Sequence, residues 1–210
     1  MLKVAAALIA GFVTMGGWAV VTVKDVPEYF VAGQPYTIEF QVRQHGWRLM
    51  SDVQPELRVS ASAGDNQRIA AKNLGNGAYA VSFTAPRAGQ VYLTIAGGWG
   101  ASNLSLYPAP VVAAGAPPPP ALAQADRGRL LFVAKGCNSC HSNIDLVNRP
   151  DNQSLAIGPE LGGRHLAREY VIQKIKNPNS EKMPTLGLSD VEATAIAAFL
   201  NGDHAAASGR

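Results

Sequence analysis

The chain has 210 residues, 47% of them hydrophobic, with 18 Lys and Arg against 15 Asp and Glu and a formal net charge of +3. This length allows one or two domains. The charges are mixed along the chain, and no basic patch with interleaved aromatic residues stands out, which argues against nucleic-acid binding. No Ser/His/Asp set and no paired carboxylates stand out either, so the sequence does not indicate a hydrolytic enzyme.

Residues 1–17 predict a signal peptide or a membrane anchor formed by an N-terminal apolar helix. Lys3 is followed by an uncharged run from Val4 to Val23, which is just long enough to span a membrane as a helix. No clean Ala-x-Ala cleavage site is present, so a retained anchor is slightly favoured. In both cases Lys3 stays on the cytoplasmic side. We therefore expect a periplasmic or other extracytoplasmic location on a bacterial membrane.

Residues 18–107 predict an all-β domain. Six short stretches alternate between apolar and polar residues, as half-buried strands do, and turn signals separate them: 19–23, 36–42, 57–61, 68–71, 78–83 and 91–95. Strands at this spacing predict a two-sheet sandwich. Gly77-Ala78-Tyr79, ahead of an alternating strand, is similar to a late hairpin of bacterial extracytoplasmic sandwiches, and the segment resembles immunoglobulin-like modules. A fold-level resemblance says little about function.

The stretch from Arg43 to Met50 is the most unusual part of this domain. His45 and Met50 are residue types that bind copper, but no further ligand lies nearby in the sequence. A loop after a strand, with Trp47 packed on the edge of the sandwich, is the simpler interpretation. A contact of Trp47 and Arg48 with a partner protein is favoured over metal binding.

Residues 108–123 are rich in proline and alanine and contain four consecutive prolines, Pro117–Pro120. Such a run is unsuited to a helix or a central strand and predicts a partly extended, semi-rigid linker. We expect it to hold the following domain some tens of ångströms from the sandwich, at ~3.1 Å per extended residue.

Cys137-Asn138-Ser139-Cys140-His141 contains both cysteines of the chain. Cys-x-x-Cys-His is the attachment site of a c-type haem. The two thiols add across the haem vinyl groups as thioethers, and the histidine becomes the proximal iron ligand. The sequence therefore predicts one covalent haem c, with Cys137 and Cys140 as attachment points and His141 bound to iron.

Other uses of a Cys-x-x-Cys pair fit less well. A thioredoxin-type disulfide belongs to an α/β domain, and no βαβ pattern is visible. A structural zinc site needs two further ligands at close spacing, whereas only His165 and His204 follow His141.

A six-coordinate haem needs a second axial ligand, commonly Met or His. Met183 is the one methionine after the haem motif. It lies in a polar, loop-like stretch, and Pro184 biases it toward an extended backbone. Although most methionines fill cores, we expect Met183 to bind the iron. His165 is the main rival, with capping of the next helix as its other role, and His204 lies in a polar tail.

Local patterns predict three helices. Residues 126–135 place apolar residues on one face and end at Gly136. Residues 166–176 repeat apolar residues at helical spacing and end before Pro178. Ser189 and Glu192 form a potential capping box for a third helix with a buried stripe, which ends at Gly202.

Residues 124–203 resemble class I c-type cytochromes, which are small, mostly helical electron carriers. The matching segments follow the order of that family: Asp126–Phe132 with Gly128 and Phe132 at a Gly-x-x-x-aromatic spacing, the haem motif, Gly158–Gly163, Met183–Leu186 and Leu188–Leu200. The resemblance implies an all-α cytochrome c domain over residues 124–210. The fold class is thus an all-β sandwich followed by an all-α domain.

The resemblance also implies several contacts. The carbonyl of Pro159 would accept a hydrogen bond from His141 and orient it. Ile196 and Phe199 would pack on Gly128 and Phe132. The family's usual tryptophan partner of a haem propionate is missing, because all three tryptophans precede residue 100. Tyr170 or Arg164 could replace it.

Several basic residues of the haem domain could surround the haem edge and steer an acidic partner: Lys135, Arg164, Lys174, Lys176 and Lys182. An ordinary solvated surface is an equal alternative, because 10 Lys and Arg stand against 9 Asp and Glu over residues 124–210.

The function that these features favour is electron transfer by a haem with His141 and Met183 as axial ligands, in a tethered subunit of a respiratory or photosynthetic membrane complex. Its partners would be redox proteins of a membrane electron-transfer chain. The alternative is an enzyme or sensor in which an open iron site binds a gas or peroxide. A third possibility is a module whose haem only helps it to fold.

Overall fold

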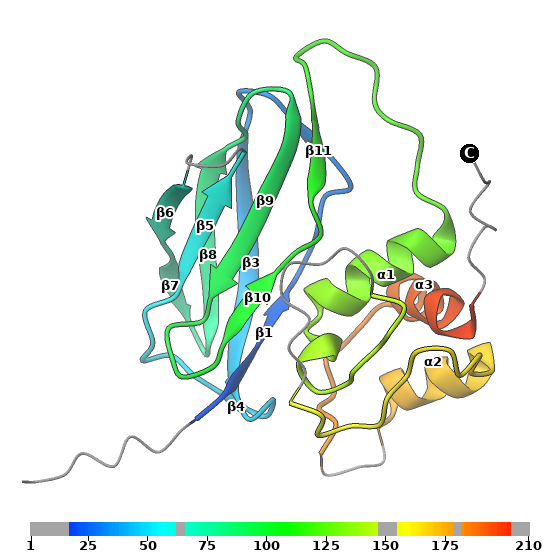
Figure 1. Ribbon diagram of the computed structural model, residues 1–210. Helices are drawn as coiled ribbons and strands as arrows, with labels where there is room; N and C mark the ends of the chain where they lie inside the picture. The colour runs from blue at the N-terminus through cyan, green and yellow to red at the C-terminus, as the bar shows by residue number, and fades with distance from the viewer. Residues whose placement is uncertain (1–16, 62–65, 147–154, 179–181, 203–210) are drawn as a thin grey trace, which may run out of the picture.

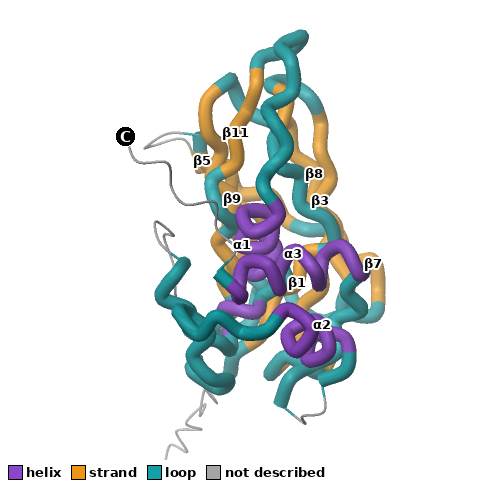
Figure 2. Tube along the Cα trace, turned by 90° about the vertical axis from the view of Figure 1, so that its right-hand side faces the viewer, coloured by secondary structure: helices purple, strands orange, loops and turns teal. Residues whose placement is uncertain are grey.

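The computed structural model describes residues 17–61, 66–146, 155–178 and 182–202. It contains a β-sandwich followed by a smaller helical domain that lies beside it (Figure 1). Turned by 90°, the molecule shows the helices in front of the strands, so that they cover one side of the sandwich (Figure 2). The order of the two domains is the order that the sequence predicts.

The sandwich consists of two sheets. In the first, the strand order is β1-β3-β8-β7, with β4 paired to β3. Its strands are β1 (Ala19–Val23), β3 (Pro35–Gln44), β4 (Arg48–Leu49), β7 (Lys72–Gly75) and β8 (Ala78–Thr84). In the second, the order is β2-β11-β9-β5-β6, with β10 paired to β9. Its strands are β2 (Phe30–Val31), β5 (Glu56–Ser60), β6 (Asn66–Ala70), β9 (Gly89–Ala96), β10 (Asn103–Ser105) and β11 (Ala109–Val112).

All six predicted strands form, with ends that differ by at most two residues from the prediction. Their alternation gives each inner face its side chains. In β3, Ile38, Phe40 and Val42 are buried, whereas the residues between them are half-buried or exposed. Phe40 stacks on Tyr79 of β8 with ring centroids 5.8 Å apart. Period-two alternation therefore fixes which face of this sheet forms the core.

The prediction of a linker over residues 108–123 is wrong at its start, because residues 109–112 form β11. This strand runs antiparallel to β9 and parallel to β2. Pro110 faces Gln90 of β9, but the pairing with β2 begins only at Val111, so that Pro110 has a strand neighbour on one side alone. A missing N–H costs least where a strand is unpaired on one side.

The helical domain contains α1 (Gln124–Ala134), the short 3-10 helix η1 (Cys137–Ser139), α2 (Arg168–Lys176) and α3 (Asp190–Asn201). The predicted capping box at Ser189 is present, and α3 ends at Gly202 in the left-handed conformation. Helices α1 and α3 cross closely at Gly128, where an added Cβ would lie 1.8 Å from the carbonyl oxygen of Ala195. Next to this crossing, Phe132 packs on Phe199 with ring centroids 5.6 Å apart.

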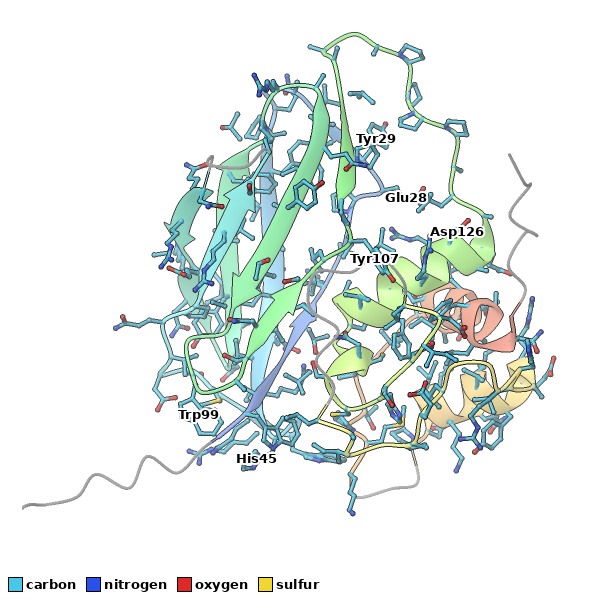
Figure 3. The ribbon with its side chains drawn as sticks, in the orientation of Figure 1. Glu28, Tyr29, His45, Trp99, Tyr107 and Asp126 are labelled. Carbon is cyan, nitrogen blue, oxygen red and sulfur yellow. The ribbon has the colours of Figure 1, made fainter. Side chains whose placement is uncertain are left out.

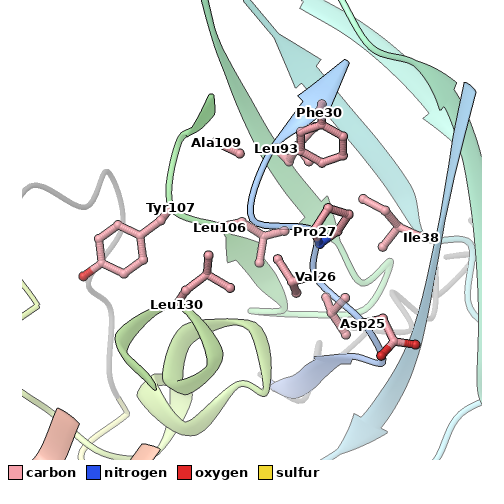
Figure 4. A pocket seen from close by; sticks show the side chains of 11 residues that line it. Asp25, Val26, Pro27, Phe30, Ile38, Leu93, Leu106, Tyr107, Ala109 and Leu130 are labelled. Atoms are coloured by element: carbon pink, nitrogen blue, oxygen red, sulfur yellow. The ribbon is translucent and has the colours of Figure 1, made fainter. Parts of the chain in front are cut away.

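The two domains are in contact, so the expected separation of tens of ångströms is wrong. Arg127 of α1 donates to the carbonyl of Val26 at 2.8 Å and pairs with Glu28 at 3.6 Å. Figure 3 shows Glu28 and Tyr107 on the side of the sandwich that faces α1. Below them, Leu130 lies against Val26 and other apolar side chains of the sandwich (Figure 4). The linker leaves the sandwich after β11 and leads to α1, which lies against the side of the sandwich that carries Glu28 and Tyr107.

Lys135 is the centre of this interface and not the surface residue that the sequence suggested. Its side chain is 5% exposed and forms an ion pair of 2.6 Å with Glu192, next to the start of α3. The same ammonium donates to the carbonyl of Lys24 at 2.6 Å, and Thr22 donates to the carbonyl of Lys135 at 3.4 Å. Lys135 therefore joins β1, α1 and α3.

The predicted N-terminal helix over residues 1–17 lies outside the described residues, except for Gly17. Across the described ranges, none of the helices has both the length and the apolar character needed to cross a membrane.

Replacement of Lys135 by methionine should destabilise the protein by about 3–5 kcal/mol, because it leaves Glu192 and the Lys24 carbonyl without their buried partner. Lys176→Met is the matched control. It removes an ion pair with Asp190 in which both side chains are well exposed, and pairs of that kind contribute about 0–1 kcal/mol. Urea unfolding measures both. Equal losses in the free energy of unfolding for Lys135→Met and Lys176→Met would contradict the role given to Lys135.

The pKa of Glu192 is lowered from its ordinary value of 4.5. Burial acts in the opposite direction, but hydrogen bonds from Lys135 and Ser189 and the charge of Lys135 outweigh it. The folded protein thus binds this proton more weakly than the unfolded chain does. The stabilisation is complete above the ordinary pKa and is lost as the pH falls through the folded pKa.

Glu192→Gln should therefore lower stability at neutral pH and flatten its decline below about pH 4.5. Thermal unfolding measured at a series of pH values checks this expectation. A decline as steep as that of the unaltered protein would show that another carboxyl group causes it.

Candidate functional site

One large cavity, of about 300 Å³, lies within the helical domain and reaches the sandwich. Its walls are mostly apolar and come from α1, η1, α2, α3 and the loops between them. The lining includes all five residues predicted for the haem site: Cys137, Cys140, His141, Pro159 and Met183. Ligand cavities in proteins are typically apolar with a few placed polar groups, and this cavity has that character.

The haem motif forms a tight turn at one wall. Gly136 takes the left-handed conformation, with φ of 75°, and ends α1. The amide N–H groups of Cys140 and His141 both donate to the carbonyl of Cys137, at 3.2 and 2.9 Å. This turn places both thiols and the imidazole on the cavity. The thiols are not joined in a disulfide. Burial raises the pKa of Cys137 to about 12 and also raises that of Cys140, so both are neutral.

His141 is held from the side by the Gly158-Pro159 loop. Its Nδ1 lies 2.9 Å from the carbonyl oxygen of Pro159. A carbonyl only accepts hydrogen bonds, so this contact requires the proton on Nδ1 and leaves the lone pair on Nε2. An added Cβ at Gly158 would come within 2.3 Å of the imidazole Cε1. Glycine at this position is therefore required by close packing on the ring.

Met183 lines the same cavity as His141, whereas His165 does not. His165 adopts the left-handed conformation, with φ of 45°. Its Nδ1 lies 3.2 Å from the carbonyl of Asn201 at the end of α3. His165 does not cap the next helix, because the N-cap of α2 is Ala167 and receives no side-chain hydrogen bond. His165 instead meets the C-terminal end of α3, which leaves Met183 as the candidate second ligand. His204 lies outside the described residues.

The basic residues named from the sequence divide into two groups. Lys135, Lys174 and Lys182 line the cavity together with Tyr170, whereas Lys176 does not. The Lys174 ammonium lies 5.9 Å from the centre of the Tyr170 ring. Arg164 is not part of the lining and donates instead to the carbonyl of Glu160 at 3.3 Å. Of the two residues suggested for a propionate, Tyr170 is thus the one at the cavity.

The sandwich has no copper site formed by His45 and Met50. Met50 is 8% exposed and belongs to the hydrophobic core. The His45 ring lies between Trp18 and Trp99, with ring centroids 5.1 and 6.1 Å away, at the end of the sandwich shown in Figure 3. No group of three His, Cys, Asp or Glu side chains able to hold a metal ion occurs among the described residues.

The sequence analysis did not predict that the sandwich contributes to the cavity. Val20 of β1 belongs to the sandwich and yet lines the cavity. The signal was present in the sequence. Residues 19–23 were interpreted as an alternating strand, but Ala19, Val20 and Val21 are all apolar, as expected of a strand that is buried on both faces.

The residues fit a covalently attached haem. Two neutral thiols stand on one wall, and an imidazole with a free Nε2 lies beside them. A thioether sulfur comes from the Met183 loop, and the remaining lining is largely apolar. This set contains the attachment points and both axial ligand types of a His/Met haem. Cys137 and Cys140 would hold the haem, and His141 and Met183 would ligate its iron.

Gly158→Ala should displace the His141 ring, because the new methyl group would occupy the position of its edge. Alanine is otherwise the mildest substitution here, since Gly158 does not have a positive φ. We expect a high-spin fraction in the optical spectrum of the haem-loaded variant. Ile157→Ala, at the neighbouring cavity residue, should stay low-spin. Identical spectra for Gly158→Ala and the unaltered protein would disprove this steric role.

Comparison with known proteins identifies the two parts differently. Residues 123–200 match the family described as cytochrome c oxidase, cbb3-type, subunit III. A search of curated protein sequences finds no match. Among solved structures, a Lin-41 filamin domain has 18% identity and a TM-score of 0.36, over 44% of this chain and 90% of that one.

The Escherichia coli adhesin FdeC also has 18% identity, with a TM-score of 0.32, over 41% of this chain and 29% of the adhesin. The N-terminal part is thus β-rich with immunoglobulin-like neighbours, and likenesses at this level carry no argument about function. The family match is specific to the helical domain. Residues 123–200 are thus a class I c-type cytochrome domain, similar to the cbb3-type subunit III family, and such a domain implies covalently bound haem c.

Proposed function

We propose that this protein is an extracytoplasmic electron carrier with one covalent haem c, ligated by His141 and Met183. The cytochrome domain in general supports haem-based electron transfer and indicates a carrier rather than an enzyme. The observation that carries the finer proposal is the presence of His141 and Met183 on one cavity together with both cysteines. When bound, the haem supplies the iron that changes between Fe(II) and Fe(III).

The protein's own residues would fix the ligands and the surroundings of the iron. The Pro159 carbonyl keeps the proton of His141 on Nδ1, which directs Nε2 to the metal and increases the basicity of the imidazole. A methionine ligand raises the reduction potential relative to a second histidine. Apolar side chains from α1, α2 and α3 keep water from the cavity. No residue is required to move a proton or to bind a substrate.

The redox partners are proteins of an electron-transfer chain, as the family implies. We further propose that residues 1–17, in which an uncharged run follows Lys3, tether the protein to the membrane, with its bulk on the outer side. A tether would keep the haem near a terminal oxidase, a reaction centre or a quinol-oxidising complex. Extracytoplasmic placement agrees with the usual location of cytochrome c domains.

Met183→Ala tests the ligand assignment in the full chain. We expect sharp low-spin c-haem bands in the reduced unaltered protein and, in its oxidised form, the weak red band that marks methionine ligation in this family. The variant should lose that band and have a lower reduction potential. Met50→Ala is the control, because it truncates a buried methionine in the sandwich core.

A red band that survives in Met183→Ala, or a high-spin spectrum in the unaltered protein, would contradict the assignment. The second result would favour an open iron site with gas or peroxide chemistry instead.

A further inference from the structure

We infer that the β-sandwich supplies one wall of the haem cavity, and that Val20 and the β3–β4 turn hold the Met183 loop closed and keep water from the haem. The inference rests on the proposed haem site and goes beyond it. The β-sandwich, which has no other assigned role, would thereby help to set the reduction potential of the haem iron.

The first support is the burial of both faces of β1. Val21 and Val23 belong to the sandwich core, whereas Val20 and Thr22 point to the opposite face. On the outer face of an edge strand such side chains are normally solvated. Here Val20 is 4% and Thr22 is 7% exposed. The cytochrome domain covers them.

The second support is the closeness of the cover. An added Cβ at Gly136 would lie 2.6 Å from Cγ1 of Val20 and 2.6 Å from the carbonyl oxygen of Val21. Gly136 directly precedes Cys137, the first attachment point. The strand therefore touches the backbone of the haem motif, and no side chain larger than hydrogen fits between them.

The third support lies on the methionine side of the cavity. A Cβ added to Gly46, in the turn between β3 and β4, would be 3.6 Å from Cγ of Pro184 and 3.8 Å from Cγ2 of Val20. Pro184 directly follows Met183, and both line the cavity with Val20. The β3–β4 turn at Gly46 therefore lies about one methyl group away from both Pro184 and Val20, which places this end of the sandwich beside the Met183 loop.

Polar contacts also hold the sandwich and the cytochrome domain together. Lys135 bonds to the Lys24 carbonyl and to Glu192, and Arg127 bonds to the Val26 carbonyl. These polar contacts prevent β1 from moving away from Gly136. An apolar wall beside a haem favours the less charged Fe(II) state, because burial in low dielectric disfavours charge. A wall that supports Pro184 also opposes dissociation of Met183 from the iron.

Val20→Thr tests the inference in the full haem-loaded chain. Threonine has nearly the shape of valine but carries a hydroxyl group, which draws water to the wall. Aspartate is avoided because Arg43 is the cross-strand neighbour of Val20 and would neutralise it. We expect a lower reduction potential. We also expect tighter binding of imidazole to the ferric iron, by about tenfold if the Met183 loop opens more often.

Val59→Thr is the matched control. Val59 is 6% exposed in β5 of the other sheet and does not line the cavity. It should weaken the sandwich without changing the potential or the affinity for imidazole. An unchanged potential in Val20→Thr, or equal changes in both variants, would overturn the inference. If the unaltered protein lacked the red methionine band, the assignment of Met183 as a ligand would fail. The reduction potentials of Val20→Thr and Val59→Thr would still decide whether the sandwich forms a wall of the haem cavity.

Discussion

The packing of β1 against the Lys135-Gly136 turn is the contact on which the rest of the structure depends. Because Gly136 has no side chain, the backbone of the haem motif and that of the strand come together without a gap. The Lys135 ammonium then donates a hydrogen bond to the carbonyl of Lys24, which directly follows β1, and forms an ion pair with Glu192. A buried ammonium needs such partners, because it is costly to bury without them. The same few residues thus end α1, begin the haem motif and join the two domains.

The haem cavity follows from this arrangement. Helices α1 and α3 cross at Gly128 and provide its floor, and the turn after Gly136 presents two thiols and His141. The Gly158-Pro159 loop fixes the imidazole from one side, and the Met183 loop approaches the same space. Each loop has a backbone constraint that the sequence contains, namely glycine where a ring or a helix comes close and proline where the chain must be extended.

The local features of the fold could be predicted from the sequence, whereas its long-range contacts could not. Alternation identified the strand over 36–42, and the Ser189–Glu192 spacing identified a capping box, because both signals are confined to a few residues. The strand β11 was hidden by the composition of a proline-rich run, since its pairing with β2 and β9 involves residues remote in sequence. The buried position of Lys135 has no local signal, because its partners lie on β1 and α3.

The haem site, too, could be predicted where its sequence signals are local. The haem motif and the Pro159 loop have short, specific patterns, and the structure brings Cys137, Cys140, His141 and Met183 to one cavity. What the motif could not indicate was the contribution of the sandwich. Val20 precedes the haem motif by more than a hundred residues, and only the packing of the two domains makes it a cavity residue. The apolar run at the start of β1 was the available sign of burial on both faces.

The redox state of the haem in membranes isolated from cells that contain the protein tests the central claim most directly. For a carrier, we expect a respiratory substrate to reduce the haem when oxygen is absent. Added oxygen should reoxidise the haem through a partner complex, and an oxidase inhibitor should block this reoxidation. A haem that stays in one oxidation state, or that binds oxygen itself and is insensitive to the inhibitor, would contradict a carrier with two protein ligands on its iron.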